Sequence, residues 1–120
     1  MKPPTFPNVA VVGMHFRERE GVPAKSIVSS FVPPVDLEYE REPSNPYDSF
    51  AIKIFYNGQH IGYAEASQAM FIAPWIDQGH NYVVVCNDLE SRKNNLHPIV
   101  TFTPADSLSS MLEQKESADL

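Results

Sequence analysis

Cysteine is almost absent from this sequence. Cys86 is the only one among 120 residues, so no disulfide can form within the chain. Long hydrophobic runs are absent too, since the longest apolar stretches, such as Val9–Val12 and Tyr82–Cys86, are far too short to span a bilayer. No apolar run of signal-peptide length follows the first residues. We therefore expect a soluble protein of a reducing compartment, the cytoplasm, with no membrane partner.

An excess of basic residues is also missing. The formal net charge is −6, and the residues up to Pro104 hold eight basic against eleven acidic side chains. Modules that follow a long phosphate backbone carry a strong basic excess. The composition therefore disfavours broad binding to duplex DNA and leaves a small local nucleic-acid site open.

Groups suited to catalysis or metal binding do not stand out. One cysteine cannot complete a thiolate site, and the four histidines share no close pair along the chain: His15, His60, His80 and His97. No nucleophile–base pair, glycine-rich phosphate loop or carboxylate constellation rises above chance. The sequence predicts no enzyme activity, no metal and no cofactor.

What the sequence does contain is a series of short strands. Its 11 prolines are spread along the chain, which favours strands and turns over long helices. The alternating or β-branched segments are Asn8–Phe16, Val35–Arg41, Phe50–Tyr56, Gln59–Tyr63, Asn81–Asn87 and His97–Thr103. Asn57-Gly58 is a strong hairpin signal, because both positions tolerate a positive φ. We predict a mainly β fold, a small antiparallel barrel of about six strands with a helix on one opening.

The remaining segments are predicted as one helix, loops and tails. Ser67–Gln78 is the helix, with Ser67 as its N-cap, a kink or restart at Pro74 and an end at Gly79. Two polar segments, Arg17–Ser26 and Asp88–Asn95, are predicted loops. Ile27–Val35 stays open between types, except that Pro33-Pro34 excludes a central strand there.

The domain organisation is predicted as one domain with two short tails. Residues 1–8 form an extended arm, residues 9–104 the domain and residues 105–120 an acidic tail. In this tail Asp106 or Ser107 is a candidate cap for a short helix to about Glu116. That helix places three apolar side chains on one side: Leu108, Met111 and Leu112.

The turn Asn45-Pro46-Tyr47-Asp48 is the chemically densest part of the chain. It gathers an amide, an aromatic ring and a carboxylate at the start of a strand, which is typical of a binding site. The same residues also suit a purely structural turn, because Asn and Asp accept backbone hydrogen bonds and Pro fixes φ. In that interpretation Tyr47 covers one end of the barrel. The residues alone leave both interpretations open.

Several segments together resemble the HIRAN domain family. They are Val11-Val12-Gly13-Met14, Arg41-Glu42-Pro43, Asn45–Ile54, Gly58, Ile61-Gly62-Tyr63 and the helix Ala69–Asp77. The resemblance covers roughly Val9 to Thr103. It implies an OB-like barrel, with one short kinked helix, that captures the free 3′-hydroxyl end of single-stranded DNA. Since the sequence holds no helicase or nuclease domain, it also implies a DNA-processing enzyme (helicase, nuclease or repair protein) acting in trans.

The resemblance also implies which residues contact the DNA. They are His15, Phe16, Asn45, Tyr47, Asp48, Tyr63 and Phe102. A terminal base stacks on aromatic rings, each contact contributing about 1–3 kcal/mol. A hydroxyl end both donates and accepts a hydrogen bond, whereas a nearby carboxylate repels a terminal phosphate. Phe16 and Phe102 are alternatively core residues, and His15 a polar strand residue.

One departure from the family pattern lowers the expected affinity for DNA. Relatives that bind DNA tend to place lysines after the Gly-Tyr step, where this chain has Ala64-Glu65-Ala66. We therefore expect end recognition to be short-range and salt-sensitive. The alternative function is a non-enzymatic protein-interaction or inhibitory module, whose acidic surface engages a DNA-processing partner without binding DNA.

Overall fold

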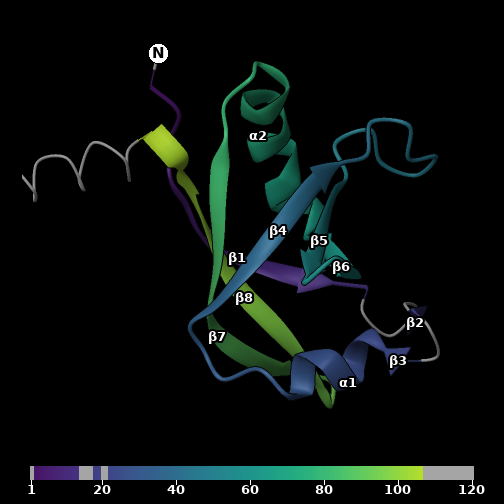
Figure 1. Ribbon diagram of the computed structural model, residues 1–120. Coiled ribbons are helices and arrows are strands. Elements are labelled where there is room, and N and C mark those ends of the chain that lie inside the picture. Colours follow the sequence, from purple (N-terminus) through teal and green to yellow (C-terminus); the bar gives the residue numbers. More distant parts are fainter. Residues whose placement is uncertain (1, 14–17, 20–21, 107–120) are drawn as a thin grey trace, which may run out of the picture.

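Six antiparallel strands close into a barrel (Figure 1). The computed structural model describes residues 2–13, 18–19 and 22–106. Around the barrel the order is β1-β6-β5-β4-β7-β8. Their bounds are Phe6–Val12 (β1), Val35–Arg41 (β4), Ile52–Tyr56 (β5), Gln59–Ala64 (β6), Tyr82–Arg92 (β7) and Asn95–Pro104 (β8). The predicted mainly β fold with a small antiparallel barrel is confirmed.

Two helices lie at opposite ends of this barrel (Figure 1). The longer helix, α2, spans Ala66–Asp77, and the shorter one, α1, spans Ala24–Ser29. Before α1, two short strands pair with each other, β2 (Glu18–Arg19) and β3 (Val22–Pro23). The predicted helix is α2, the one with more than seven residues. The loop predicted over residues 17–26 is wrong where the chain is described, since β2, β3 and the start of α1 lie there. Residues 24 and 28 of α1 are buried in the core, and this packing favours a helix where local sequence gave no clear signal.

The core fills the barrel with side chains from every main strand. Among the largest fully buried ones are Ile52 and Ile54 of β5, Ile61 of β6 and Phe102 of β8. Strand β4 shows the predicted alternation, since Leu37 is buried while its neighbours on either side are exposed. One face of β4 therefore packs on the core and the other lies in water.

Two hairpin turns use left-handed backbone conformations. Asn57 and Gly58 have φ of 47° and 79°, which confirms the predicted turn between β5 and β6. Lys93 and Asn94 have φ of 50° and 67° and join β7 to β8. The sequence predicted a polar loop over Asp88–Asn95, but the two strands stay paired as far as the turn. Both faces of this hairpin end are largely exposed, which explains its polar composition. Cross-strand pairing nevertheless keeps it extended, so the loop prediction is wrong.

Helix α2 differs from its prediction at the start and agrees with it at the end. Its N-cap is Glu65, without a side-chain capping bond, so Ser67 lies inside the helix and is not the cap. The helix continues through Pro74 to Asp77 without the predicted restart. It ends at Gly79, where the N–H groups of Gly79 and His80 donate to carbonyls of the last turn at 2.9 and 3.2 Å. Together with the φ of 99° at Gly79, this is a Schellman ending.

The N-terminal boundary shifts by a few residues. Strand β1 begins at Phe6, so residues 6–8 of the predicted arm belong to the barrel. The Tyr82 hydroxyl also donates to the Pro4 carbonyl at 2.9 Å, which holds the N-terminal residues against β7. The predicted tail helix to Glu116 lies outside the described residues. In the described part of the chain, no helix is long and apolar enough to cross a membrane.

Candidate nucleic-acid interface

The loop between β4 and β5, residues 42–51, projects from the barrel (Figure 1). Its backbone is held by its own polar side chains. The Asn45 Oδ1 atom accepts hydrogen bonds from the N–H groups of Tyr47 and Asp48 at 2.8 and 3.0 Å. Asp48 Oδ1 accepts one from the Phe50 N–H at 2.8 Å. The turn chemistry expected of Asn and Asp is therefore present, and it fixes the conformation from which Tyr47 projects.

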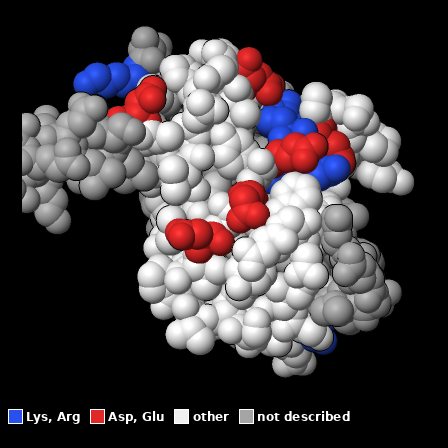
Figure 2. Space-filling view, viewed as in Figure 1, with Lys and Arg blue, Asp and Glu red and all other residues white. Residues whose placement is uncertain are grey.

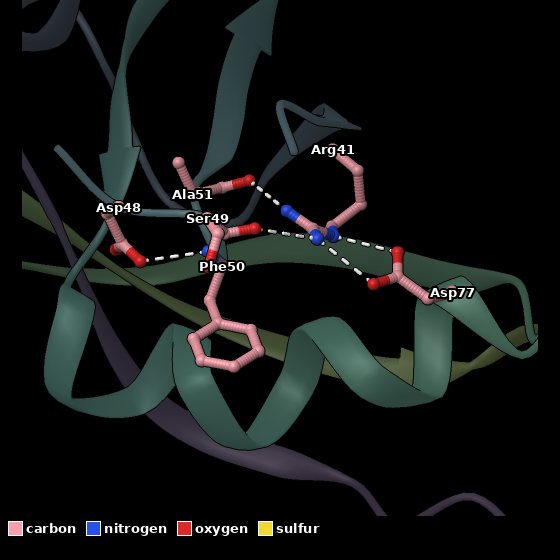
Figure 3. Close-up of polar contacts among 6 residues, drawn as sticks. All are labelled: Arg41, Asp48, Ser49, Phe50, Ala51 and Asp77. Carbon is pink, nitrogen blue, oxygen red and sulfur yellow. Dashed lines mark hydrogen bonds and ion pairs between the residues drawn. The ribbon is translucent and has the colours of Figure 1, made fainter. Parts of the chain in front are cut away.

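Arg41, the last residue of β4, anchors the far end of this loop (Figure 3). Its guanidinium donates to the carbonyls of Ala51 and Ser49 at 2.7 and 2.9 Å. The same group pairs with both carboxylate oxygens of Asp77 at 2.9 and 3.0 Å. The hydrogen bond from Arg41 lowers the pKa of Asp77. The Arg41 side chain is 10% exposed, so one cation that is mostly shielded from water ties the loop to the end of α2.

Glu42 anchors the near end of the loop. Its Oε1 atom accepts hydrogen bonds from Asn45 Nδ2 at 2.6 Å and from the Tyr63 hydroxyl at 3.0 Å. Its Oε2 atom pairs with Lys53 Nζ at 2.9 Å. These partners, Lys53 first and Asn45 next, lower the pKa of Glu42 to about 2, and Glu42 in turn raises the pKa of Lys53. One carboxylate thus joins the loop to β5 and β6.

Neither Arg41 nor Glu42 was assigned a role from the sequence, although both lie in a segment that carries the family resemblance. The signal that points to them is their place in the sheet. Arg41 is the last residue of β4 and pairs with Ile52, and Lys53 is the next residue on β5. A glutamate just past the end of a strand, with a lysine at the start of the neighbouring strand, is a candidate ion pair that anchors a loop.

The predicted site residues are distributed unevenly. Tyr47 is 96% exposed and presents its ring to solvent, whereas Asn45, Asp48 and Tyr63 are half-buried. Glu42 brings Asn45 and Tyr63 together, because both donate to the same carboxylate oxygen. The described part of the site is therefore a cluster of half-buried polar side chains with one exposed aromatic ring beside it.

Phe102 is not part of this surface. Its side chain is 0% exposed, and its ring lies between those of Tyr39 and Tyr82, at centroid distances of 5.9 and 6.1 Å. No face of the ring is open to a base, so we correct the expectation that Phe102 contacts DNA and assign it to the core. The inward alternation of β8 places it there.

His15 and Phe16 lie outside the described residues, but the strand that leads to them is placed. Val12 of β1 pairs with Tyr63 of β6. The next residue, Gly13, has a φ of 80°, a conformation that favours glycine. A Cβ atom added at Gly13 would lie 4.0 Å from the Tyr63 ring. Gly13, the last residue described before this gap, thus lies beside the Tyr63 side of the site.

Charges near the site are largely neutralised. Arg41, Lys53 and Arg92 each pair with a carboxylate, the last with Glu90 at 2.7 Å and Glu65 at 3.7 Å. Figure 2 shows acidic side chains in a row over β4, whose exposed acids are Asp36, Glu38 and Glu40. Among the described residues, no group of three or more His, Cys, Asp or Glu side chains is placed to hold a metal ion. The surface is suited to a short contact and not to a long phosphate backbone.

A closed antiparallel barrel of six strands, with an exposed aromatic ring on the loop of residues 42–51, defines a small domain of the OB-like class. Within that class the family can be named. The sequence model of the HIRAN domain family matches residues 6–100, and the chain therefore belongs to this family. The family is known as a DNA-binding module and not as a catalytic domain. No curated protein matches the sequence.

Two solved structures share the fold. A crystal structure of a protein from Lactobacillus plantarum is 21% identical, with a TM-score of 0.66, over 82% of this chain and 92% of that chain. The crystal structure of the HIRAN domain of human HLTF is 20% identical, with a TM-score of 0.62, over 83% of this chain and 74% of that chain. At these identities the likeness establishes the barrel and its topology alone.

Proposed function

We propose that this chain is a DNA-binding module that recognises single-stranded DNA at a free 3′-hydroxyl end. It works with a DNA-processing enzyme (helicase, nuclease or repair protein) in trans, in the cytoplasm and without a cofactor. One observation carries the proposal: the 96% exposed ring of Tyr47 stands on a loop whose two ends are fixed by Arg41 and Glu42. An exposed aromatic ring on a rigid loop loses little conformational entropy when it stacks on a base.

The residues of the loop divide into contacting and positioning groups. Tyr47 stacks on the terminal base, and Asp48 lies next to it in the chain. Each oxygen of an ionised carboxylate has two acceptor sites, so Asp48 can hold the Phe50 N–H and still accept the 3′-hydroxyl. Asn45 acts mainly by shaping the turn, since its Oδ1 atom already accepts two backbone N–H groups.

The second side of the site is supplied by the segment that follows β1. Phe16 is proposed to stack on the other face of the base, and His15 to contact the neighbouring phosphate. The pairing of Val12 with Tyr63 supports this, because it brings the chain to the site just before these residues. Tyr63 supports the site from beneath through its hydrogen bond to Glu42.

Fluorescence anisotropy with short single-stranded oligonucleotides at low salt tests the proposal. We expect tighter binding to an oligonucleotide with a 3′-hydroxyl than to the same sequence with a 3′-phosphate, because Asp48 repels the added charge. Asp48→Asn keeps an acceptor oxygen but loses the charge, and should narrow that difference. Phe71→Ala is the matched control for Tyr47→Ala, since Phe71 is an exposed aromatic (61%) on α2. Equal affinity for both ends would contradict end capture.

The alternative, a protein-interaction module without DNA binding, is favoured by one observation. Among the described basic residues, Arg41, Lys53 and Arg92 pair with carboxylates, while the acidic row of β4 is exposed. This alternative predicts no oligonucleotide binding even at low salt. It also predicts co-purification with a basic protein, lost on removal of Asp106–Leu120.

A further inference from the structure

Helix α2 presents an apolar surface that no described residue covers. Met70 and Phe71 are 47% and 61% exposed, although they are neighbours in the chain on a helix that buries Ala69 and Ile72. A pocket of about 200 Å³ opens next to them, lined by Phe6, Pro7, Val9, Gln68 and Phe71. Large exposed apolar side chains beside a concave apolar site are typical of a docking surface.

Gln68 adds a polar group to this surface. Its Nε2 atom donates to the Asn8 carbonyl at 3.1 Å, whereas its Oε1 atom is buried and has no hydrogen-bond donor among the described residues. A buried acceptor without a donor is unfavourable, so native structures leave few of them. The terminal torsion of glutamine is soft, and a small rotation turns this oxygen toward a donor that enters the pocket.

The end of the described chain lies beside the pocket. Phe6, one of its walls, pairs with Phe102 of β8 and contacts the Tyr82 ring at a centroid distance of 6.2 Å. Two residues after Phe102, β8 ends at Pro104, and the Ala105 N–H donates to the Asn81 carbonyl at 2.9 Å. Figure 1 shows this end of the chain and α2 at the same end of the barrel. Residues 107–120 therefore follow the strand that borders the pocket at Phe6, and a helix of this length would span about 20 Å, enough to turn back to it.

We propose that this surface of α2 is the docking site for the chain's own C-terminal segment, residues 107–120. Its three apolar side chains, Leu108, Met111 and Leu112, have the spacing of one helix face and match a groove that takes such a face. They cover Met70 and Phe71 and fill the pocket, while Glu113 and Glu116 stay in water. The hydroxyl of Ser109, which flanks this face, or an N–H at the start of the segment donates to Gln68 Oε1.

A short segment suffices because the contact is made within one chain. Covalent linkage holds the segment close to the pocket, at an effective concentration that is high compared with that of any free partner. The apolar surface is then covered in the isolated protein. This inference does not depend on DNA binding, since it concerns α2 and the C-terminal segment and not the loop of residues 42–51.

The test is NMR on the full chain labelled with ¹³C in its methionine methyl groups. The sequence has four methionines, and Met70 and Met111 lie on the two sides of the proposed contact. We expect nuclear Overhauser effects from the Met111 methyl to the Met70 methyl or the Phe71 ring, with no change when the protein is diluted. The double variant Leu108→Asp, Leu112→Asp should abolish them and shift the Met70 signal.

A matched double variant, Ser109→Asp and Ser110→Asp, adds the same charge to the same segment. It should keep the contacts between Met111 and α2, because backbone N–H groups remain available to Gln68. Both pairs of substitutions lie outside the described core. NMR signals of barrel residues that match those of the wild type therefore show that each variant is folded. Contacts that weaken on dilution would assign the surface to a second copy and overturn the proposal. A Met70 signal that is the same in all three proteins would overturn it as well.

Discussion

Two polar segments of this chain, the loop of residues 42–51 and the arm formed by the ends of β7 and β8, differ in what holds them. The loop is fixed by side chains, since Asn45, Arg41 and Glu42 bond to its backbone or to one another. The arm is fixed by strand pairing, which continues as far as Arg92 and Asn95. Polar composition alone therefore does not mark a site. Side chains that are used to shape a loop, with an aromatic ring left exposed, are the more informative pattern.

The largest expected difference between the two regions is in stability. Arg41→Met keeps the apolar stem but leaves two carbonyls and the Asp77 carboxylate without their donor. We expect a loss of about 2–3 kcal/mol in the free energy of unfolding, because the guanidinium is mostly shielded from water and all its partners are lost together. Urea unfolding followed by circular dichroism measures it.

The control in the arm is Arg92→Met. Arg92 also pairs with a carboxylate, but both side chains are well exposed, 40% for Arg92 and 50% for Glu90. Solvent screens an exposed pair of this kind, so we expect no measurable change in the free energy of unfolding. Similar losses for the two variants would show that the loop is no more dependent on its side chains than the arm is.

The pH dependence of stability provides the second contrast. Glu42 has a pKa of about 2 in the folded protein, below the value of about 4.3 expected in the unfolded chain. The unfolded state therefore binds the proton more readily, and the stabilising effect of Glu42 is present above about pH 4.3 and lost as the pH falls toward 2. Glu42→Gln should remove about 2–3 kcal/mol at pH 7 and flatten the decline over this window.

The matched change in the arm is Glu90→Gln, which removes a carboxylate whose described partner is the exposed Arg92. We expect it to alter the free energy of unfolding at pH 7 by less than about 1 kcal/mol. Unfolding curves of the three proteins at several pH values between 2 and 7 are the measurement. A Glu42→Gln profile that runs parallel to the wild type would contradict the role of Glu42 as the anchor of the loop.

Much of the fold was predictable because it follows from local patterns. The alternation of β4 and the Asn57-Gly58 turn each carry their structure in a few neighbouring residues. The extension of β7 to Arg92 and the helix α1 were missed, because pairing with β8 and packing against the core decide them. Both depend on residues distant in sequence.

The candidate site was predictable only in part, for the same physical reason. The turn residues Asn45 and Asp48 could be predicted from their residue types, since Asn and Asp accept backbone N–H groups. Glu42 does not, because its function is visible only once Lys53 and Tyr63 are brought to it from β5 and β6. Phe102 was misplaced because an aromatic residue on a strand suits a core as well as a surface, and only the register of β8 decides between them.

The third contrast is in DNA binding. Tyr47→Ala removes the exposed ring of the loop, and we expect oligonucleotide affinity to fall by about 1–3 kcal/mol, or roughly five- to 150-fold. Leu96→Ala removes an exposed apolar side chain (39%) of the arm and should leave affinity unchanged. Anisotropy titrations measure both, and the stability of each variant should stay within about 0.5 kcal/mol of the wild type. An equal loss of affinity in the two variants would move the site away from the loop.

The smallest effect is expected at the tips of the two hairpins. The turn between β5 and β6 has Asn57 and Gly58 at its two left-handed positions, whereas the tip of the arm has Lys93 and Asn94, with φ of 50° and 67°. Glycine adopts this conformation more readily than any other residue, so Asn94→Gly should stabilise the protein by about 0.5 kcal/mol. The gain belongs to the arm alone, and we expect oligonucleotide affinity to stay at its wild-type value. Thermal unfolding should show a small rise in midpoint, and a fall would mean that the Asn94 side chain stabilises the tip through a bond that glycine cannot make.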